Sequence, residues 1–121
     1  IKNMQLKWTE RIPLTQSGVD RIKATAGVYR LINYSRTDDK YYVYYVGQAD
    51  DLNNRLSQHL SGNETNECCQ KYLDNYTCYF RAAAISGQAD RDGAEVALYN
   101  KFEPSCVERI PDVKPLEINF D

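Results

Sequence analysis

The spacing of hydrophobic and polar positions changes along the chain, and each change marks the boundary of a predicted element. Two stretches rich in β-branched and aromatic residues, 27–34 and 41–46, predict strands, and the polar residues 35–40 between them predict an antiparallel hairpin. A similar stretch, 76–85, predicts a third strand. We therefore expect a three-stranded antiparallel sheet.

Other apolar positions repeat with the period of a helix. They predict helices over residues 51–60, 67–75 and 90–102, preceded by a short helix over 18–23 that is capped by Ser17. Asp50 or Asp51 is expected to cap the first long helix, and Pro104 to stop the last. Residues 4–13 are expected to be extended, and residues 116–120 to form an edge strand.

The predicted order of elements is strand, strand, helix, helix, strand, helix. This order indicates a small α/β protein of the α+β type, with a three-stranded antiparallel sheet flanked by helices. A chain of 121 residues, 42% of them hydrophobic, has the size and composition of one globular domain, with its core over about residues 26–104. No apolar run approaches the roughly 20 residues of a membrane span, so we expect no membrane contact and a cytoplasmic protein.

The four cysteines predict no metal or disulfide framework. They lack C-x-x-C spacing, and adjacent Cys68 and Cys69 are badly placed to bind one zinc ion together. We expect these two, with Cys78 and Cys106, to be buried or free thiols in a reducing compartment.

The charge balance neither requires nor excludes a nucleic-acid partner. Fifteen Lys and Arg residues against 17 Asp and Glu make the chain slightly acidic, whereas nucleic-acid binders are usually basic. The cations, however, are concentrated before residue 41, which allows a local basic face.

Two helices carry candidate chemistry. Arg55 and His59 are four residues apart on the flank of an apolar stripe, so they project where the helix meets the sheet; they suit either a phosphate ligand or an ordinary solvated flank. Glu95 lies on the apolar face of the last helix, with the spacing of Leu98 and Phe102. A carboxylate there requires either an ion-pair partner or a hard divalent cation such as Mg²⁺.

Ten tyrosines are many for a chain of this size. Most are expected to pack with the hydroxyl at the rim of the core, although tyrosine clusters also stack on bases in single-stranded nucleic-acid binders. Periodicity alone does not distinguish Tyr29 and Tyr45 from the others.

Taken together, the motifs resemble the GIY-YIG nuclease signature. Gly27-Val28-Tyr29 and Tyr45-Val46-Gly47 lie in order on consecutive predicted strands, and Arg55, His59 and later Glu95 follow on helices. The resemblance spans about residues 26–104 and implies the fold predicted above. It also implies a metal-dependent endonuclease that hydrolyses phosphodiester bonds in nucleic acid, with DNA the expected substrate and Mg²⁺ or Mn²⁺ the cofactor.

The resemblance implies a role for each of these residues. Tyr29, made more acidic by a cation or metal, would accept the proton of the attacking water, with His59 or Tyr45 assisting. Arg55 would neutralise the phosphate oxygens, and Glu95 would hold the metal. Because one site cuts one strand, cleavage of both strands would require a homodimer or sequential nicking.

The chain departs from the family pattern in two places. Gln48 stands where repair-type members often carry Lys, and no Asn closely follows Pro104, which leaves Asn100 and Asn119 unassigned. Gln48 and the acidic charge balance favour an alternative, a non-catalytic nucleic-acid-binding or protein-interaction module that retains the fold.

Overall fold

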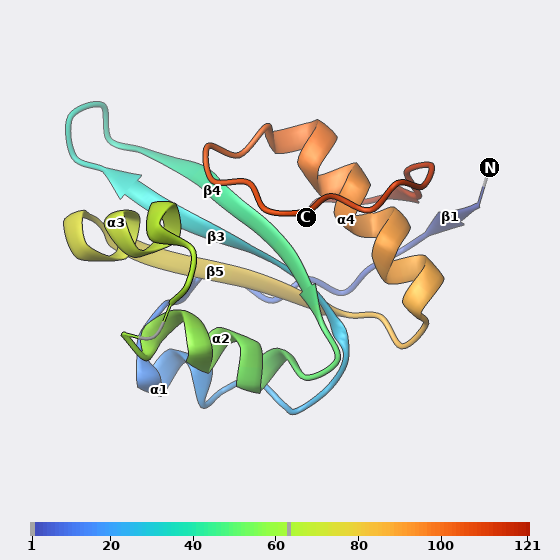
Figure 1. Ribbon diagram of the computed structural model, residues 1–121, viewed down its shortest axis with the longest axis horizontal. Helices are drawn as coiled ribbons and strands as arrows, with labels where there is room; N and C mark the ends of the chain where they lie inside the picture. Colours follow the sequence, from blue (N-terminus) through green and yellow to red (C-terminus); the bar gives the residue numbers. More distant parts are fainter. Residues whose placement is uncertain (1, 63) are drawn as a thin grey trace.

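The computed structural model describes residues 2–62 and 64–121, and it is built around one antiparallel sheet (Figure 1). The sheet has the order β2-β5-β3-β4, made of β2 (Ile12–Pro13), β5 (Thr77–Ala84), β3 (Gly27–Ser35) and β4 (Lys40–Ala49). The three predicted strands are confirmed. The fourth, β2, consists of only two residues, which pair with Tyr79 and Phe80 and are too few to produce a periodic signal.

The helices cover both faces of the sheet (Figure 1). The structure contains α1 (Gln16–Val19), α2 (Leu52–Leu60), α3 (Glu67–Asn75) and α4 (Gln88–Phe102). The first three pack on one face, where Leu52, Leu56 and Cys69 join a core with Tyr29 and Tyr45. The other face packs against α4 in a second core that contains Val28, Val46, Ala94 and Leu98. This division follows from the alternation of side chains along each strand.

Short polar side chains begin the helices next to the site. Asp51 caps α2, accepting a hydrogen bond from the Asn54 N–H at 3.0 Å, and Asn66 caps α3. The short first helix begins earlier than predicted, because Thr15 rather than Ser17 accepts the hydrogen bond of the cap. At the other end of the chain, α4 stops at Glu103, which adopts a left-handed conformation with φ 45° before Pro104.

The two ends of the chain pair with each other. Strand β1 (Asn3–Met4) runs parallel to β6 (Glu117–Ile118), so the predicted C-terminal strand forms a separate two-stranded sheet. Between α4 and β6 the chain returns along the edge of the main sheet, where the Cys106 N–H donates to the Tyr44 carbonyl at 2.8 Å.

This return path corrects the expectation that all four cysteines are thiols. Cys68 at the start of α3 forms a disulfide with Cys106, 38 residues further along the chain, whereas Cys69 and Cys78 are buried free thiols as predicted. The argument from free thiols to a reducing compartment therefore loses its support. Over the described residues, no helix combines the length and apolar character needed to cross a bilayer.

Candidate active site

Two tyrosines on neighbouring strands form the floor of the site. Tyr29 on β3 and Tyr45 on β4 are both buried, and their ring centroids lie 6.1 Å apart. A bulge in β4 lets the consecutive residues Tyr44 and Tyr45 both join the core beneath α2 and α3. Gly47 pairs with Tyr29, and a Cβ at this glycine would lie only 2.7 Å from the Tyr29 hydroxyl. The glycine therefore makes room for the phenol.

Helix α2 places an imidazole directly on these rings. His59 is 2% exposed, and its Nε2 lies 2.8 Å from the Tyr29 hydroxyl. Its ring meets both tyrosine rings edge-on, with centroids 5.5 Å from Tyr29 and 5.4 Å from Tyr45. His59 therefore lies inside the site rather than on a solvated flank.

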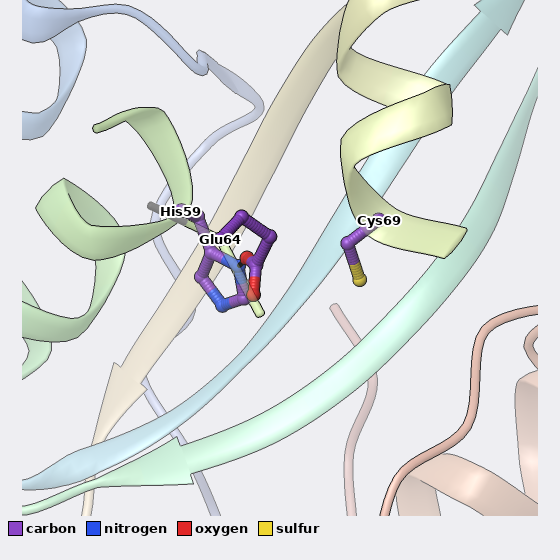
Figure 2. Close-up of side chains that lie close together, drawn as sticks. All are labelled: His59, Glu64 and Cys69. Carbon is purple, nitrogen blue, oxygen red and sulfur yellow. Dashed lines mark hydrogen bonds and ion pairs between the residues drawn. The ribbon is translucent and has the colours of Figure 1, made fainter. Parts of the chain in front are cut away.

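The other imidazole nitrogen contacts a residue that the sequence did not indicate. His59 Nδ1 pairs with the carboxylate of Glu64, whose side chain is buried in the loop between α2 and α3 (Figure 2). Although burial opposes it, the hydrogen bond from His59 lowers the pKa of Glu64. An ionised carboxylate can only accept, so Nδ1 carries a proton; in the neutral imidazole, Nε2 then accepts from the Tyr29 hydroxyl. Tyr29, His59 and Glu64 thus form one hydrogen-bonded chain.

Arg55 lies at the rim of the same cluster. Its side chain is partly exposed, and its Nη2 is 3.9 Å from Glu108, a second loop residue that the sequence did not indicate. A hollow of about 330 Å³ opens beside it, lined by Arg55, Gln58, Ser61, Glu64 and Thr65. This position gives a phosphate access to the guanidinium from solvent.

The protein surroundings do not make Tyr29 more acidic. Burial and the neighbouring Tyr45 raise the pKa of Tyr29 well above its ordinary value, and the charge of Arg55 opposes this rise without reversing it. Burial and Glu108 likewise raise the pKa of Tyr45. The nearby cation Arg55 therefore acts in the expected direction, but burial outweighs it among the protein groups. The phenol is neutral, and its proton is directed at His59.

Glu95 occupies a separate, buried position on α4. It is 6% exposed and accepts a hydrogen bond of 2.9 Å from the Gln48 amide, which also donates to Asp92 at 2.7 Å. Burial and the negative charges of Asp92 and Glu108 raise its pKa, although the Gln48 hydrogen bond lowers it. No cationic side chain pairs with Glu95 in the described part of the chain, so the predicted alternative of a structural ion pair is not found.

The charge of Glu108 acts on both parts of the site. Neither a hydrogen bond nor an ion pair joins Glu95 to the tyrosine–histidine cluster within residues 2–62 and 64–121. The charge of Glu108, however, raises the pKa of both Tyr45 and Glu95. Glu108 lies in the segment that the Cys68–Cys106 disulfide fastens to α3.

A divalent cation fits Glu95 better than it fits the histidine. Glu95 has carboxylates as neighbours and no cation, which is an oxygen-rich environment of the kind that Mg²⁺ requires. His59, Glu64 and Cys69 also place one ligand atom each within 4.8 Å of one another (Figure 2). Burial, Glu64 and Glu108 raise the pKa of Cys69 to about 12, however, so it remains a thiol, and both nitrogens of His59 already have partners. This trio does not suit a hard cation.

The family model of the GIY-YIG catalytic domain matches residues 25–118, which is more than half of the chain. The chain belongs to the GIY-YIG family. The resemblance found in the sequence is thereby confirmed, and the family match continues beyond residue 104 into the tail that carries Cys106 and Glu108.

Solved structures share the fold of this GIY-YIG domain. A point mutant of the N-terminal endonuclease domain of UvrC from Thermotoga maritima, bound to its catalytic divalent cation, superposes with a TM-score of 0.61 at 18% identity over 78% of this chain and 94% of that chain. The magnesium-bound form of that domain gives a TM-score of 0.59 at 20% identity, over 74% and 91%. No curated protein matches the sequence. The likeness shows a GIY-YIG nuclease fold.

The two unassigned asparagines lie outside the site of this GIY-YIG domain. Asn119 is structural, since its amide accepts from the Leu6 N–H at 2.6 Å and donates to the Leu6 carbonyl at 2.8 Å. Asn100 is exposed on α4. Neither replaces the asparagine that often follows the proline in the family.

Proposed function

We propose that this GIY-YIG domain is a divalent-metal-dependent endonuclease that hydrolyses phosphodiester bonds in DNA. The observation that carries the proposal is the buried hydrogen-bonded chain from Tyr29 through His59 to Glu64, which ends beside Arg55. A purely structural core has no need for this arrangement, because burying a Tyr–His–Glu chain gains less than burying apolar residues of equal size.

The geometry supports a relay for the proton of the attacking water. As the water oxygen forms its bond to phosphorus, its proton passes to the Tyr29 oxygen, while the Tyr29 proton passes to His59 Nε2. Glu64 holds the imidazole in the accepting tautomer and stabilises the imidazolium that forms. This route needs no tyrosinate in the resting protein, in agreement with the raised pKa of Tyr29.

Arg55 neutralises the negative charge that builds up on the phosphate during the reaction. Its guanidinium is partly exposed beside the hollow and offers a fork of donors to the non-bridging oxygens. Glu95 would hold Mg²⁺ or Mn²⁺, and the bound ion would stabilise the negative charge of the leaving oxygen. The bond from phosphorus to the leaving oxygen then breaks without a covalent intermediate.

A plasmid nicking assay tests this proposal. Supercoiled, linear, single-stranded and branched DNA, together with RNA, are incubated with Mg²⁺, with Mn²⁺ or with EDTA. We expect metal-dependent nicking by the native chain and none by Tyr29→Phe, which removes only a hydroxyl. Tyr76→Phe is the matched control, because Tyr76 is exposed and lies outside the relay.

Two results would contradict the proposal. Binding of nucleic acid without cleavage under any metal condition would favour the alternative of a non-catalytic module. Near-normal cleavage by Tyr29→Phe from about pH 6 to about pH 9 would remove Tyr29 from the relay and leave His59 to accept the proton directly.

A further inference from the structure

A second cluster of charged residues lies on the sheet face opposite Tyr29. Arg30 on β3 and Arg81 on β5 are direct partners in the register of the two strands. Side chains of such partners point to the same face, and like charges placed directly opposite each other repel. Burial and then repulsion by Arg81 lower the pKa of Arg30 to about 10. The pair therefore requires a compensating negative charge.

The protein compensates Arg30 only in part. The side chain is 4% exposed, and its Nη2 donates to the Phe120 carbonyl at 2.7 Å. The rings of Trp8 and Phe102 lie 4.6 and 4.9 Å from its Cζ and stabilise the charge. Its Nη1 is nevertheless buried without any hydrogen-bond acceptor in the part of the chain that the structure describes. A buried donor without an acceptor is unusual in a folded protein.

The positive charge of Arg81 is compensated by a carboxylate that is exposed to solvent. Its Nε donates to the Thr9 carbonyl at 2.8 Å, and its Nη1 lies 3.0 Å from Asp121. The side chain of Asp121 is 96% exposed, so water screens this ion pair.

Arg11 adds a third guanidinium to the same region. It stacks 3.5 Å from the ring of Tyr41, and within residues 2–62 and 64–121 it has no acidic partner. Glu10, a carboxylate in the lining of the same hollow, is already paired with Arg21 at 2.5 Å. The region thus carries a local surplus of positive charge on a chain whose net charge is −2.

These three arginines line one hollow of about 510 Å³, which is larger than the hollow beside Arg55 and has Tyr41 and Tyr42 in its wall. We propose that this hollow is a second phosphate-binding site, which takes the phosphate group of a nucleotide or of a nucleic-acid backbone. Guanidinium forks match phosphate oxygens, and the half-exposed tyrosine rings offer a surface on which a base can stack. The site lies across the sheet from the relay and does not depend on nuclease activity.

The test compares Arg11→Gln and Arg81→Gln with Arg36→Gln, an equal change of charge at an exposed arginine in the β3–β4 turn. Arg11 is also exposed, so its variant should fold normally even if replacing the buried Arg30 would not. Two probes are used in EDTA: inorganic phosphate, followed by calorimetry, and a single-stranded oligonucleotide, followed by anisotropy at several salt concentrations.

We expect phosphate to bind the native chain and Arg36→Gln, and to bind Arg11→Gln and Arg81→Gln about tenfold more weakly. If the natural ligand is a nucleic-acid backbone, oligonucleotide affinity also falls in these two variants, and the slope of its salt dependence drops by about one. If it is a nucleotide or free phosphate, the oligonucleotide affinity of the two variants stays equal to that of Arg36→Gln while their phosphate binding is weakened. Equal behaviour of all four proteins toward both probes would overturn the proposal.

Discussion

Replacing Glu95 by Gln tests whether this carboxylate is kept for a cation. The substitution preserves the shape of the side chain, and the remaining amide oxygen still accepts from Gln48. Only the charge is removed. Glu95 is 6% exposed, it has one hydrogen bond among the described residues, and its charge is repelled by Asp92 and Glu108. Leaving a buried polar group incompletely satisfied costs about 1–3 kcal/mol. Without metal, Glu95→Gln should therefore be more stable at neutral pH by about 1–2 kcal/mol.

The effect should depend on pH in a defined direction. The folded-state pKa of Glu95 is raised above its ordinary value of 4.5, so the folded protein binds this proton more tightly than the unfolded chain does. The stability that Glu95 contributes is fully present below pH 4.5 and is lost as the pH rises through the raised pKa. The two proteins should thus melt alike at acidic pH, and the difference should grow toward neutral pH.

Thermal melting in EDTA and plasmid nicking with Mg²⁺ measure the two consequences. At neutral pH we expect a higher melting temperature for Glu95→Gln, by about 3–5 °C for each kcal/mol in a chain of this size. We also expect no nicking and nucleic-acid binding that is retained or slightly tighter. Glu103→Gln, an exposed change next to α4, should match the native chain in both assays. A variant that is less stable by about 3–5 kcal/mol, as for a broken buried ion pair, and that still cuts would refute the metal assignment.

Three further substitutions test the other parts of the site. Arg55→Ala should raise the barrier to cleavage by about 3 kcal/mol in single-turnover kinetics without lowering the melting temperature, and full activity would exclude its contact with the phosphate. Glu64→Gln should slow cleavage at least about a hundredfold. It should also remove a stabilisation that is present above the ordinary pKa of 4.5 and is lost as the pH falls through the lowered folded value of Glu64. A melting profile identical to that of the native chain would disprove the stabilising hydrogen bond from His59. Cys106→Ser should destabilise the oxidised protein by about 3–4 kcal/mol, and the difference should disappear in dithiothreitol; equal melting in oxidising buffer would mean that the disulfide does not stabilise the fold.

Much of the fold was predictable because it depends on residues close together in sequence. The hairpin of β3 and β4, the N-cap at Asp51 and the stop near Pro104 follow from local patterns, and all are found in the structure. Strand β2 was not predicted as a strand, since its two residues are ordered only by pairing with β5, more than sixty positions later. The disulfide was missed for the same reason, because its cysteines are 38 residues apart and meet only after the tail has folded back.

The residues of the candidate site likewise fall into those that local sequence patterns identify and those that they do not. Tyr29, Tyr45, Arg55, His59 and Glu95 lie on regular elements, where motif spacing identifies them. Glu64 and Glu108 lie in loops, so no helical or strand periodicity marks them, although both lie beside the predicted residues. A carboxylate five residues after His59 would have been the only available signal, and it is too common to be informative.

Gln48 differs from the lysine of repair-type members mainly in lacking its positive charge. In the structure its single amide nitrogen serves both Asp92 and Glu95, whereas a lysine at this position would bring a positive charge to the same two carboxylates. With a neutral amide, no cation among the described residues compensates the negative charge around Glu95, and this charge adds to burial in raising the pKa of Glu95. A bound divalent cation would then supply the positive charge that a lysine would otherwise have supplied. On this argument, Gln48 would make the proposed site depend more strongly on a bound metal, which is a second interpretation of the residue beside the non-catalytic module.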